Sequence, residues 1–141
     1  MVLKSPFGGF RGLYQNLKIM NTALVMLGSN SNADQNLELS KEKLTEYFEI
    51  VTQSSRLFTK PIGKQYIDDF QNEAIKILSA ETADETKIIF KQIELELGRT
   101  PESKKSGIIP IDIDLIFWNE KLLHEDYNRF DFVRTCVDEI K

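Results

Sequence analysis

Hydrophobic and polar positions alternate along this chain with two different periods. Short apolar runs rich in β-branched residues predict strands, and apolar positions three or four residues apart predict helices. Strands are expected at residues 22–27, 50–59, 70–78 and 107–118. Helices are expected from Asn32 to about Phe48 and from Thr82 to Leu97. The elements therefore follow the order strand, helix, strand, strand, helix, strand.

Residues that favour helix ends support these boundaries. Asn32 with Gln35, and Thr82 with Glu85, have the spacing of a capping box, in which both side chains hydrogen-bond to the backbone of the first turn. Gly98 is placed to end the second helix, because glycine readily adopts the left-handed conformation that follows many helices. Both helices are therefore expected to have defined ends.

The C-terminal part of the chain shows weaker patterns. Residues 99–109 are mostly polar and predict an irregular loop, whereas Asn119-Glu120 predicts a turn into a short strand at 121–123. Apolar residues on one side of 131–140 predict a last helix with Asp131 as its cap.

This order of elements predicts an α+β fold of the ferredoxin-like βαββαβ type, an antiparallel sheet with helices packed on one face. Residues 21–141 are expected to form a single domain, because no linker interrupts them and a chain of 141 residues can bury one substantial core. Residues 1–20 hold Pro6 and several glycines, which break any periodicity. We expect them to form an N-terminal extension outside the core.

The composition is that of an ordinary globular protein and excludes some classes of function. Hydrophobic residues make up 41% and charged residues 28%, and the formal net charge of −4 argues against a general nucleic-acid binder. No apolar run approaches the length of a membrane span. The single cysteine, Cys136, excludes an internal disulfide and fits a cytoplasmic protein, in which we interpret it as a small apolar helix residue.

Asp112 and Asp114 are the residues of this chain that carry the clearest chemistry. Residues two apart in a strand point to the same face, so the two carboxylates are expected side by side, roughly 7 Å apart at their roots. The opposite face is expected to turn Ile111, Ile113, Leu115 and Phe117 toward the core. Two like charges this close need water or a cation, and Mg²⁺ with phosphate suits them. The alternative is an edge strand with a solvated charged face.

Four local motifs, in chain order, resemble those of one enzyme family. They are Gly28-Ser29-Asn30; residues 56–63 (RLFTKPIG) with 70–74 (FQNEA); residues 94–99 (ELELGR); and residues 110–114 (PIDID). Together they resemble the 6-hydroxymethyl-7,8-dihydropterin pyrophosphokinase family of folate synthesis. The resemblance covers about residues 22–140.

The resemblance implies an activity and its cofactors. The family transfers pyrophosphate from ATP to the hydroxymethyl group of the pterin, and two Mg²⁺ ions bridge the phosphates. By resemblance Asp112 and Asp114 hold these metals, and Arg99 joins them as a catalytic residue. The expected partners are small molecules, ATP and the reduced pterin, and we expect a monomer.

The resemblance also implies which residues line the two substrate sites. The pterin site is matched by Thr59, Ile62, Phe70, Asn72 and Phe132. The nucleotide site is matched by Glu94, Arg99, Lys104, Lys105, Leu115 and His124. A flat heterocycle needs an aromatic surface and an amide that pairs with its edge. Phe70 replaces a family tyrosine, and the segment that carries His124 is shorter than in the family.

The sequence departs from the family pattern on the nucleotide side. Pro101 and Ile109 stand where the family has arginines, and Ser106 where a tryptophan usually sits. Lys104 and Lys105 supply point charge but no planar bidentate clamp. The alternatives left open are an active enzyme with rearranged lysines, a partner-supplied arginine or a divergent substrate; an impaired homologue that binds nucleotide or pterin without efficient turnover; and a ferredoxin-like interaction module without a ligand.

Overall fold

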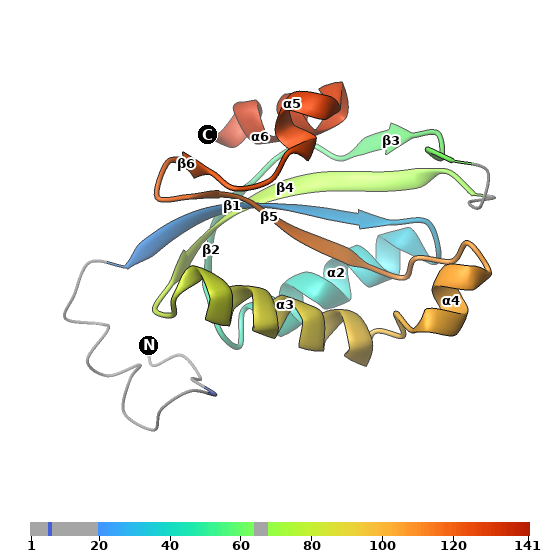
Figure 1. The fold of residues 1–141 in the computed structure, drawn as a ribbon, viewed down its shortest axis with the longest axis horizontal. Coiled ribbons are helices and arrows are strands. Elements are labelled where there is room, and N and C mark those ends of the chain that lie inside the picture. The colour runs from blue at the N-terminus through green and yellow to red at the C-terminus, as the bar shows by residue number, and fades with distance from the viewer. Residues whose placement is uncertain (1–5, 7–19, 64–67) are drawn as a thin grey trace.

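The computed structural model describes residue 6, residues 20–63 and residues 68–141 (Figure 1). The strands are β1 (Asn21–Ser29), β2 (Glu49–Gln53), β3 (Leu57–Thr59), β4 (Phe70–Ser79), β5 (Asp112–Trp118) and β6 (Lys121–Leu122). The helices are α2 (Ala33–Leu44), α3 (Ala83–Glu96), α4 (Pro101–Lys105), α5 (Asp126–Arg129) and α6 (Asp131–Ile140). The predicted extension at 1–20 lies outside the described residues except for Pro6 and Met20.

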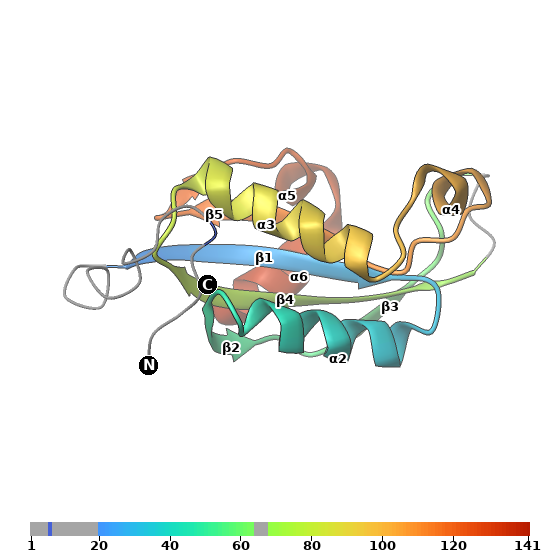
Figure 2. The same cartoon turned by 90° about the horizontal axis from the view of Figure 1, so that it is seen from below.

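The strands form one antiparallel sheet in the order β2-β4-β1-β5-β6. The short strand β3 pairs with the first three residues of β4, and β2 pairs with its later residues. The long strands β1 and β4 occupy the centre of the sheet (Figures 1 and 2). The register places Gly28 of β1 opposite both Asn72 of β4 and Asp112 of β5. Two segments that lie 40 residues apart in the sequence therefore meet across one glycine.

Helices cover both faces of this sheet. The predicted α+β fold is confirmed, and α2 and α3 pack together on one face as expected (Figure 2). The last helix, α6, packs instead on the opposite face of β1 and β4 (Figure 1). A second apolar cluster fills this layer and includes Met26, Ile116 and the buried Cys136. The sheet is therefore buried on both sides over much of its length.

A β-bulge in β5 corrects the predicted orientation of Phe117. Leu24 pairs with Phe117 but Val25 pairs with Leu115, so Ile116 is an extra residue in the ladder. Leu115 packs toward α2 and α3 as predicted, whereas Phe117 packs on the α6 side with Ile116. The prediction that Phe117 shares a face with Leu115 was wrong, because the bulge resets the two-residue alternation.

The two predicted capping boxes had different outcomes. Thr82 accepts a hydrogen bond from the backbone N–H of Glu85, whose side chain accepts one from the N–H of Thr82, as predicted. Asn32 has a left-handed backbone, with φ of 43°, and its side chain makes no cap hydrogen bond. The first helix also ends at Leu44 rather than near Phe48.

Three further segments differ from the sequence predictions. The predicted strand at 50–59 is two strands, because Ser54 Oγ accepts the N–H of Ala74 and interrupts the ladder. The predicted irregular loop at 99–109 contains α4, whose N-cap is Thr100. The last helix begins at Asp131 as expected, but its N-cap is Phe130 and no side chain caps it.

Two other features at the ends of elements agree with the predictions. Asn119 and Glu120 both have positive φ, as a tight hairpin turn into β6 requires. Gly98 has a φ of +100° and follows the end of α3. Over the residues described, each helix is too short or too polar to cross a bilayer.

Candidate active site

A cavity of about 240 Å³ opens on the α6 side of the sheet, beside the ends of β1, β3 and β5. All the residues matched to the pterin site line it, together with both aspartates: Thr59, Ile62, Phe70, Asn72, Phe132, Asp112 and Asp114. They come from four strands or loops and one helix, and the antiparallel register brings them together. The structure therefore gathers one group of predicted residues around a single hollow.

Asn72 is buried and held in one orientation. Its Nδ2 donates to Thr59 Oγ1 at 2.9 Å and to the carbonyl of Leu57 at 3.3 Å. A Cβ atom on Gly28 would lie 3.1 Å from Asn72 Oδ1. Glycine in the opening motif therefore leaves space beside the amide oxygen, and that oxygen can accept a hydrogen bond from a ligand.

Aromatic rings form one end of the cavity. Phe130 and Phe132 are stacked, with ring centroids 5.7 Å apart and planes inclined by 27°. Both line the cavity, as does Phe70 from β4. Sequence reasoning identified Phe132 and Phe70 but missed Phe130, which stands just before α6. These rings provide apolar surfaces suited to a flat ring system.

The two aspartates share a face of β5 as predicted, but their partners differ. Arg99 donates to Asp112 and also lies 3.3 Å from Glu94 Oε2. Asp114 has a weaker contact, 3.9 Å between its Oδ1 and His124 Nε2. Both carboxylates line the cavity, so the arginine pairs with Asp112 without closing the site.

Glu94 holds both Arg99 and the backbone of β5 through its carboxylate. Its side chain is 3% exposed, and its Oε2 accepts the backbone N–H of Ile113 at 2.8 Å as well as Arg99. Lys91 reaches the other oxygen at 3.2 Å. Glu94 therefore fixes Arg99 against β5, and its carboxylate is already occupied by these partners.

Burial and like charge perturb the ionisation of these groups. Burial, followed by the charge and hydrogen bond of Asp112, raises the pKa of Asp114 to about 8. Burial also raises the pKa of Glu94, which the Ile113 N–H and Arg99 only partly offset. Burial lowers the pKa of Arg99, but Asp112 and Glu94 outweigh it and the net shift is upward. A bound cation would favour the ionised form of carboxyl groups whose pKa is raised in this way.

Five of the six residues matched to the nucleotide site line two neighbouring hollows. Glu94, Arg99 and Lys104 line one of about 380 Å³, beside the start of α4. Leu115 and His124 line another of about 220 Å³, which Asp114 also borders. Lys105 ends α4, is exposed, and lines neither of these hollows.

Pro101 and Ile109, the two positions at which the resemblance predicts arginines, have structural roles here. Pro101 occupies the first turn of α4, where a missing N–H costs nothing. Ile109 is 3% exposed and its backbone is clamped by Asn30, which accepts its N–H at 2.7 Å and donates to its carbonyl at 3.0 Å. Asn30 of the opening motif therefore anchors this loop to β1.

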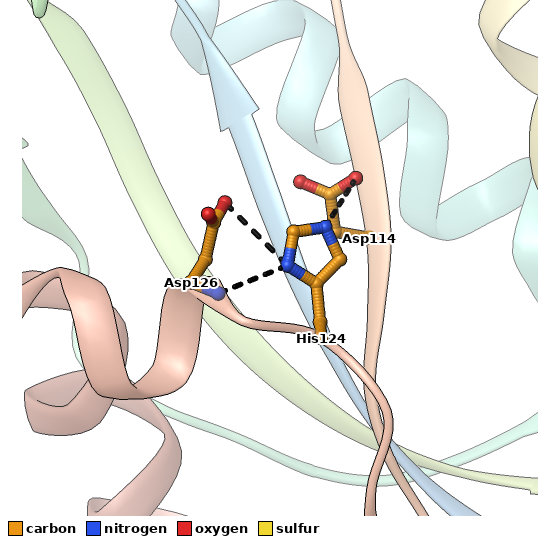
Figure 3. Close-up of side chains that lie close together, drawn as sticks. All are labelled: Asp114, His124 and Asp126. Atoms are coloured by element: carbon orange, nitrogen blue, oxygen red, sulfur yellow. Dashed lines mark hydrogen bonds and ion pairs between the residues drawn. The ribbon is translucent and has the colours of Figure 1, made fainter.

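Sequence reasoning missed Asp126, which completes a cluster with Asp114 and His124 (Figure 3). His124 Nδ1 lies 3.6 Å from Asp126 Oδ2 and accepts the backbone N–H of Asp126 at 3.2 Å. Asp126 also lines the cavity. Only the His-x-Asp spacing before a short helix signals this arrangement in the sequence.

Known proteins with similar sequences and folds were then compared with this chain. It is 29% identical over 105 residues to the folate synthesis bifunctional protein of Arabidopsis thaliana, covering 73% of this chain and 22% of the relative. A Plasmodium falciparum HPPK-DHPS crystal structure matches with a TM-score of 0.53 and 17% identity, covering 86% of this chain and 35% of that one. An HPPK-DHPS structure in complex with substrates gives a TM-score of 0.50 and 15% identity, over 72% of this chain and 29% of that chain.

These structural matches support the fold, and this chain spans only about a quarter to a third of the length of the proteins concerned. A family model provides the more direct assignment. The model described as 7,8-dihydro-6-hydroxymethylpterin-pyrophosphokinase (HPPK) matches residues 24–141, which include every residue of the candidate site. The chain therefore belongs to the HPPK family.

Proposed function

We propose that this protein transfers pyrophosphate from ATP to 6-hydroxymethyl-7,8-dihydropterin with the help of Mg²⁺. The observation that carries the proposal is the single cavity lined by all the matched pterin residues and by Asp112 and Asp114. An acceptor and a metal-bound phosphate chain would meet there.

The pterin would lie between the aromatic rings and Asn72. Phe70, Phe130 and Phe132 offer apolar surfaces, and Asn72 Oδ1 can accept from a ring-edge N–H. Because Thr59 and Leu57 hold the amide nitrogen, Asn72 would present its oxygen without losing side-chain freedom on binding. We expect this pair of features to select a flat heterocycle.

Asp112 and Asp114 fit a site for Mg²⁺, because they offer hard carboxylate oxygens on one face of β5 and both line the cavity. Two Mg²⁺ ions, when bound, would neutralise charge on the phosphate oxygens around the β-phosphorus. The chain's own contribution is to orient these carboxylates: Glu94 holds Arg99, and Arg99 holds Asp112. Arg99 would also be positioned near the phosphates of a bound nucleotide.

A second candidate function is supported by the loop that precedes β5. Ile109 is buried and Pro101 begins α4, so neither position supplies a guanidinium. An arginine that stabilises charge in phosphoryl transfer can contribute about 10³ to 10⁵ in rate. An impaired homologue that binds ATP or pterin with slow turnover is therefore the alternative. Lys104, which lines the same hollow as Arg99, would supply part of that charge.

The test measures AMP formation from ATP with Mg²⁺ and the reduced pterin, with each component omitted in turn. AMP that forms only when ATP, Mg²⁺ and the pterin are all present would support the proposed enzyme activity. Calorimetric binding of ATP or pterin without AMP supports the impaired homologue, and no binding of either supports an interaction module.

The metal role is tested separately. Asp112→Ala should abolish metal-dependent ATP binding, whereas Asp69→Asn, an exposed acid before β4, should leave it unchanged. Equal binding by the two variants would contradict the metal role of Asp112. We further propose that the protein is cytoplasmic, acts on small molecules and is a monomer. A dimer in analytical sedimentation would contradict the proposed monomer.

A further inference from the structure

The short strand β3 carries part of the cavity wall but joins the sheet through a short ladder. Among the described strands only β4 pairs with it, over three residue pairs (Figure 1). The carbonyl of Leu57 and Oγ1 of Thr59 both accept Asn72 Nδ2, at 3.3 and 2.9 Å. A slip of β3 by one residue would turn its side chains to the other face of the sheet. The orientation of the Asn72 amide therefore depends on the register of β3.

Arg56, the residue before β3, is paired with carboxylates of two elements. Its Nη1 lies 3.0 Å from Asp34 Oδ1 and its Nη2 lies 2.9 Å from Glu38 Oε1, both on α2. The same Nη2 lies 3.5 Å from Glu73 Oε1 on β4. The side chains of Asp34 and Glu38 are 84% and 61% exposed, whereas that of Glu73 is 3% exposed. Because solvent screens exposed ion pairs, we expect the contact with Glu73 to contribute most to the position of β3.

Glu73 also stands where the ladder between β3 and β4 would continue. Leu57 pairs with Asn72 in antiparallel register, so Arg56 and Glu73 are the next two residues in line. Their ion pair extends the short ladder by one cross-strand pair of opposite charge, which favours this register. Lys41 also pairs with Glu73, at 2.9 Å, so Glu73 keeps a cation when Arg56 is replaced.

The same connection is held from the other face of the sheet. Glu139 of α6 accepts the backbone N–H of Ser55 at 3.0 Å and its hydroxyl at 2.8 Å. Two successive residues before β3 are thus tied to helices on opposite faces, Ser55 to α6 and Arg56 to α2. These contacts fix where the chain enters β3.

We propose that Arg56 is a positioning residue for the cavity, because its hold on β3 keeps the Asn72 amide in one orientation. The amide oxygen then remains available to a ligand, and less side-chain freedom is lost on binding. The inference rests on the proposed function for the identity of that ligand, the pterin. Loss of Arg56 should therefore weaken pterin binding and leave the nucleotide unaffected.

The first experiment needs no ligand and measures solvent exchange of the Asn72 side-chain amide by NMR. In Arg56→Met we expect exchange at least about tenfold faster than in wild type, as loss of one hydrogen bond allows, with the α3 backbone amides unchanged as reference. Lys43→Met is the matched control, since Lys43 lies on the same helix but pairs with Glu96 of α3 at 2.9 Å. Arg56→Lys keeps one charge beside Glu73 but loses the planar fork, so its rate should be intermediate.

The second experiment titrates the pterin and, separately, ATP with Mg²⁺ by calorimetry. Arg56→Met should raise the Kd for the pterin by about tenfold, the net contribution of one hydrogen bond, and should leave the Kd for ATP unchanged. A merely structural role would weaken both ligands together, because both need the folded protein.

Equal exchange rates of the Asn72 amide in wild type and folded Arg56→Met would overturn the inference, as would a matching acceleration in α3. If Arg56→Met does not fold, Arg56→Lys provides the same comparison. Faster Asn72 exchange in the variant, with no pterin binding by wild type, would support the positioning role and reject the proposed function. AMP formation by wild type, with unchanged pterin Kd in both folded variants, would do the reverse.

Discussion

Replacing Asp114 with asparagine should change how the stability of the metal-free protein depends on pH. In the folded protein, burial and the neighbouring Asp112 raise the pKa of Asp114 to about 8 from its ordinary value of 3.8. A carboxyl group with a raised folded-state pKa favours folding when it is protonated and opposes it when it is ionised. Asparagine keeps a similar shape and carries no charge at any pH.

The sign and size follow from the two pKa values. Below about pH 4 the group is protonated in both states and carries no penalty; as the pH rises toward 8, the folded state becomes progressively less stable. If Asp114 titrated alone, about 4 kcal/mol would be lost between pH 5 and pH 8. Asp112 carries a like charge beside Asp114, so the two groups titrate as a pair and we expect about half of that, ~2 kcal/mol.

Urea unfolding at pH 5 and pH 8, in chelator, measures this difference. The stability of Asp114→Asn relative to wild type should rise by ~2 kcal/mol from pH 5 to pH 8. The exposed Asp69→Asn variant should show no such change. Parallel pH profiles for wild type and Asp114→Asn would refute the argument that Asp112 and the surroundings of Asp114 disfavour its ionised form.

Three further substitutions test other parts of the structure. Lys41→Met removes the nearer of the two cations beside the buried Glu73, at 2.9 Å, and leaves Arg56 at 3.5 Å; it should cost about 2 kcal/mol in urea unfolding. Adding Glu73→Gln should restore much of this stability, and an unchanged midpoint in the single variant would contradict the pairing of Lys41 with Glu73. Gly28→Ala places a Cβ 3.1 Å from Asn72 Oδ1 and should raise KM for the pterin but not for ATP. If the variant and the wild type had the same KM for the pterin, this amide would not contact the pterin. Arg99→Lys loses the planar bridge to two carboxylates and should lower kcat by about 10³-fold, and an unchanged kcat would exclude a catalytic role.

The strand alternation was predictable from the sequence only as long as the ladder remained regular. Asp112 and Asp114 lie on one face and Ile113 and Leu115 on the other, as the two-residue period requires. The extra residue at Ile116 then reverses the phase. A bulge depends on the partner strand, so the pattern within one strand does not reveal it.

Capping shows a similar limit. Thr82 and Asn32 begin the same sequence pattern, but only Thr82 has the extended backbone, with ψ of 168°, that points a side chain at the first turn. Asn32 adopts the left-handed conformation, which asparagine tolerates well. Its backbone follows Asn30, which is tied to the loop at Gly107 and Ile109. The left-handed backbone of Asn32 therefore occurs next to a long-range contact, and helix-capping propensity alone does not predict it.

For the candidate site, residues brought together by the central strands were predictable, and those on the returning C-terminal segment were not. Asp126 belongs to a short helix that the periodicity did not indicate, and it reaches the site because β6 reverses the chain. Phe130 lies at a helix start with no pattern of its own. Their places depend on tertiary packing rather than on local sequence signals.

The balance of charge in the cavity constrains the order of binding. Asp112, Asp114 and Asp126 line it, whereas Lys60 is the only lysine or arginine among its described lining residues. Arg99 reaches Asp112 from outside this cavity and is shared with Glu94. A triphosphate carries several negative charges of its own, and its repulsion from these carboxylates would be strong where water is partly excluded. The two positions at which the sequence resemblance predicts arginines hold a buried isoleucine and a helix-starting proline. For the proposed transfer, cations would have to bind before the nucleotide or together with it, and nucleotide affinity should depend on divalent ions more steeply than in a site rich in arginine.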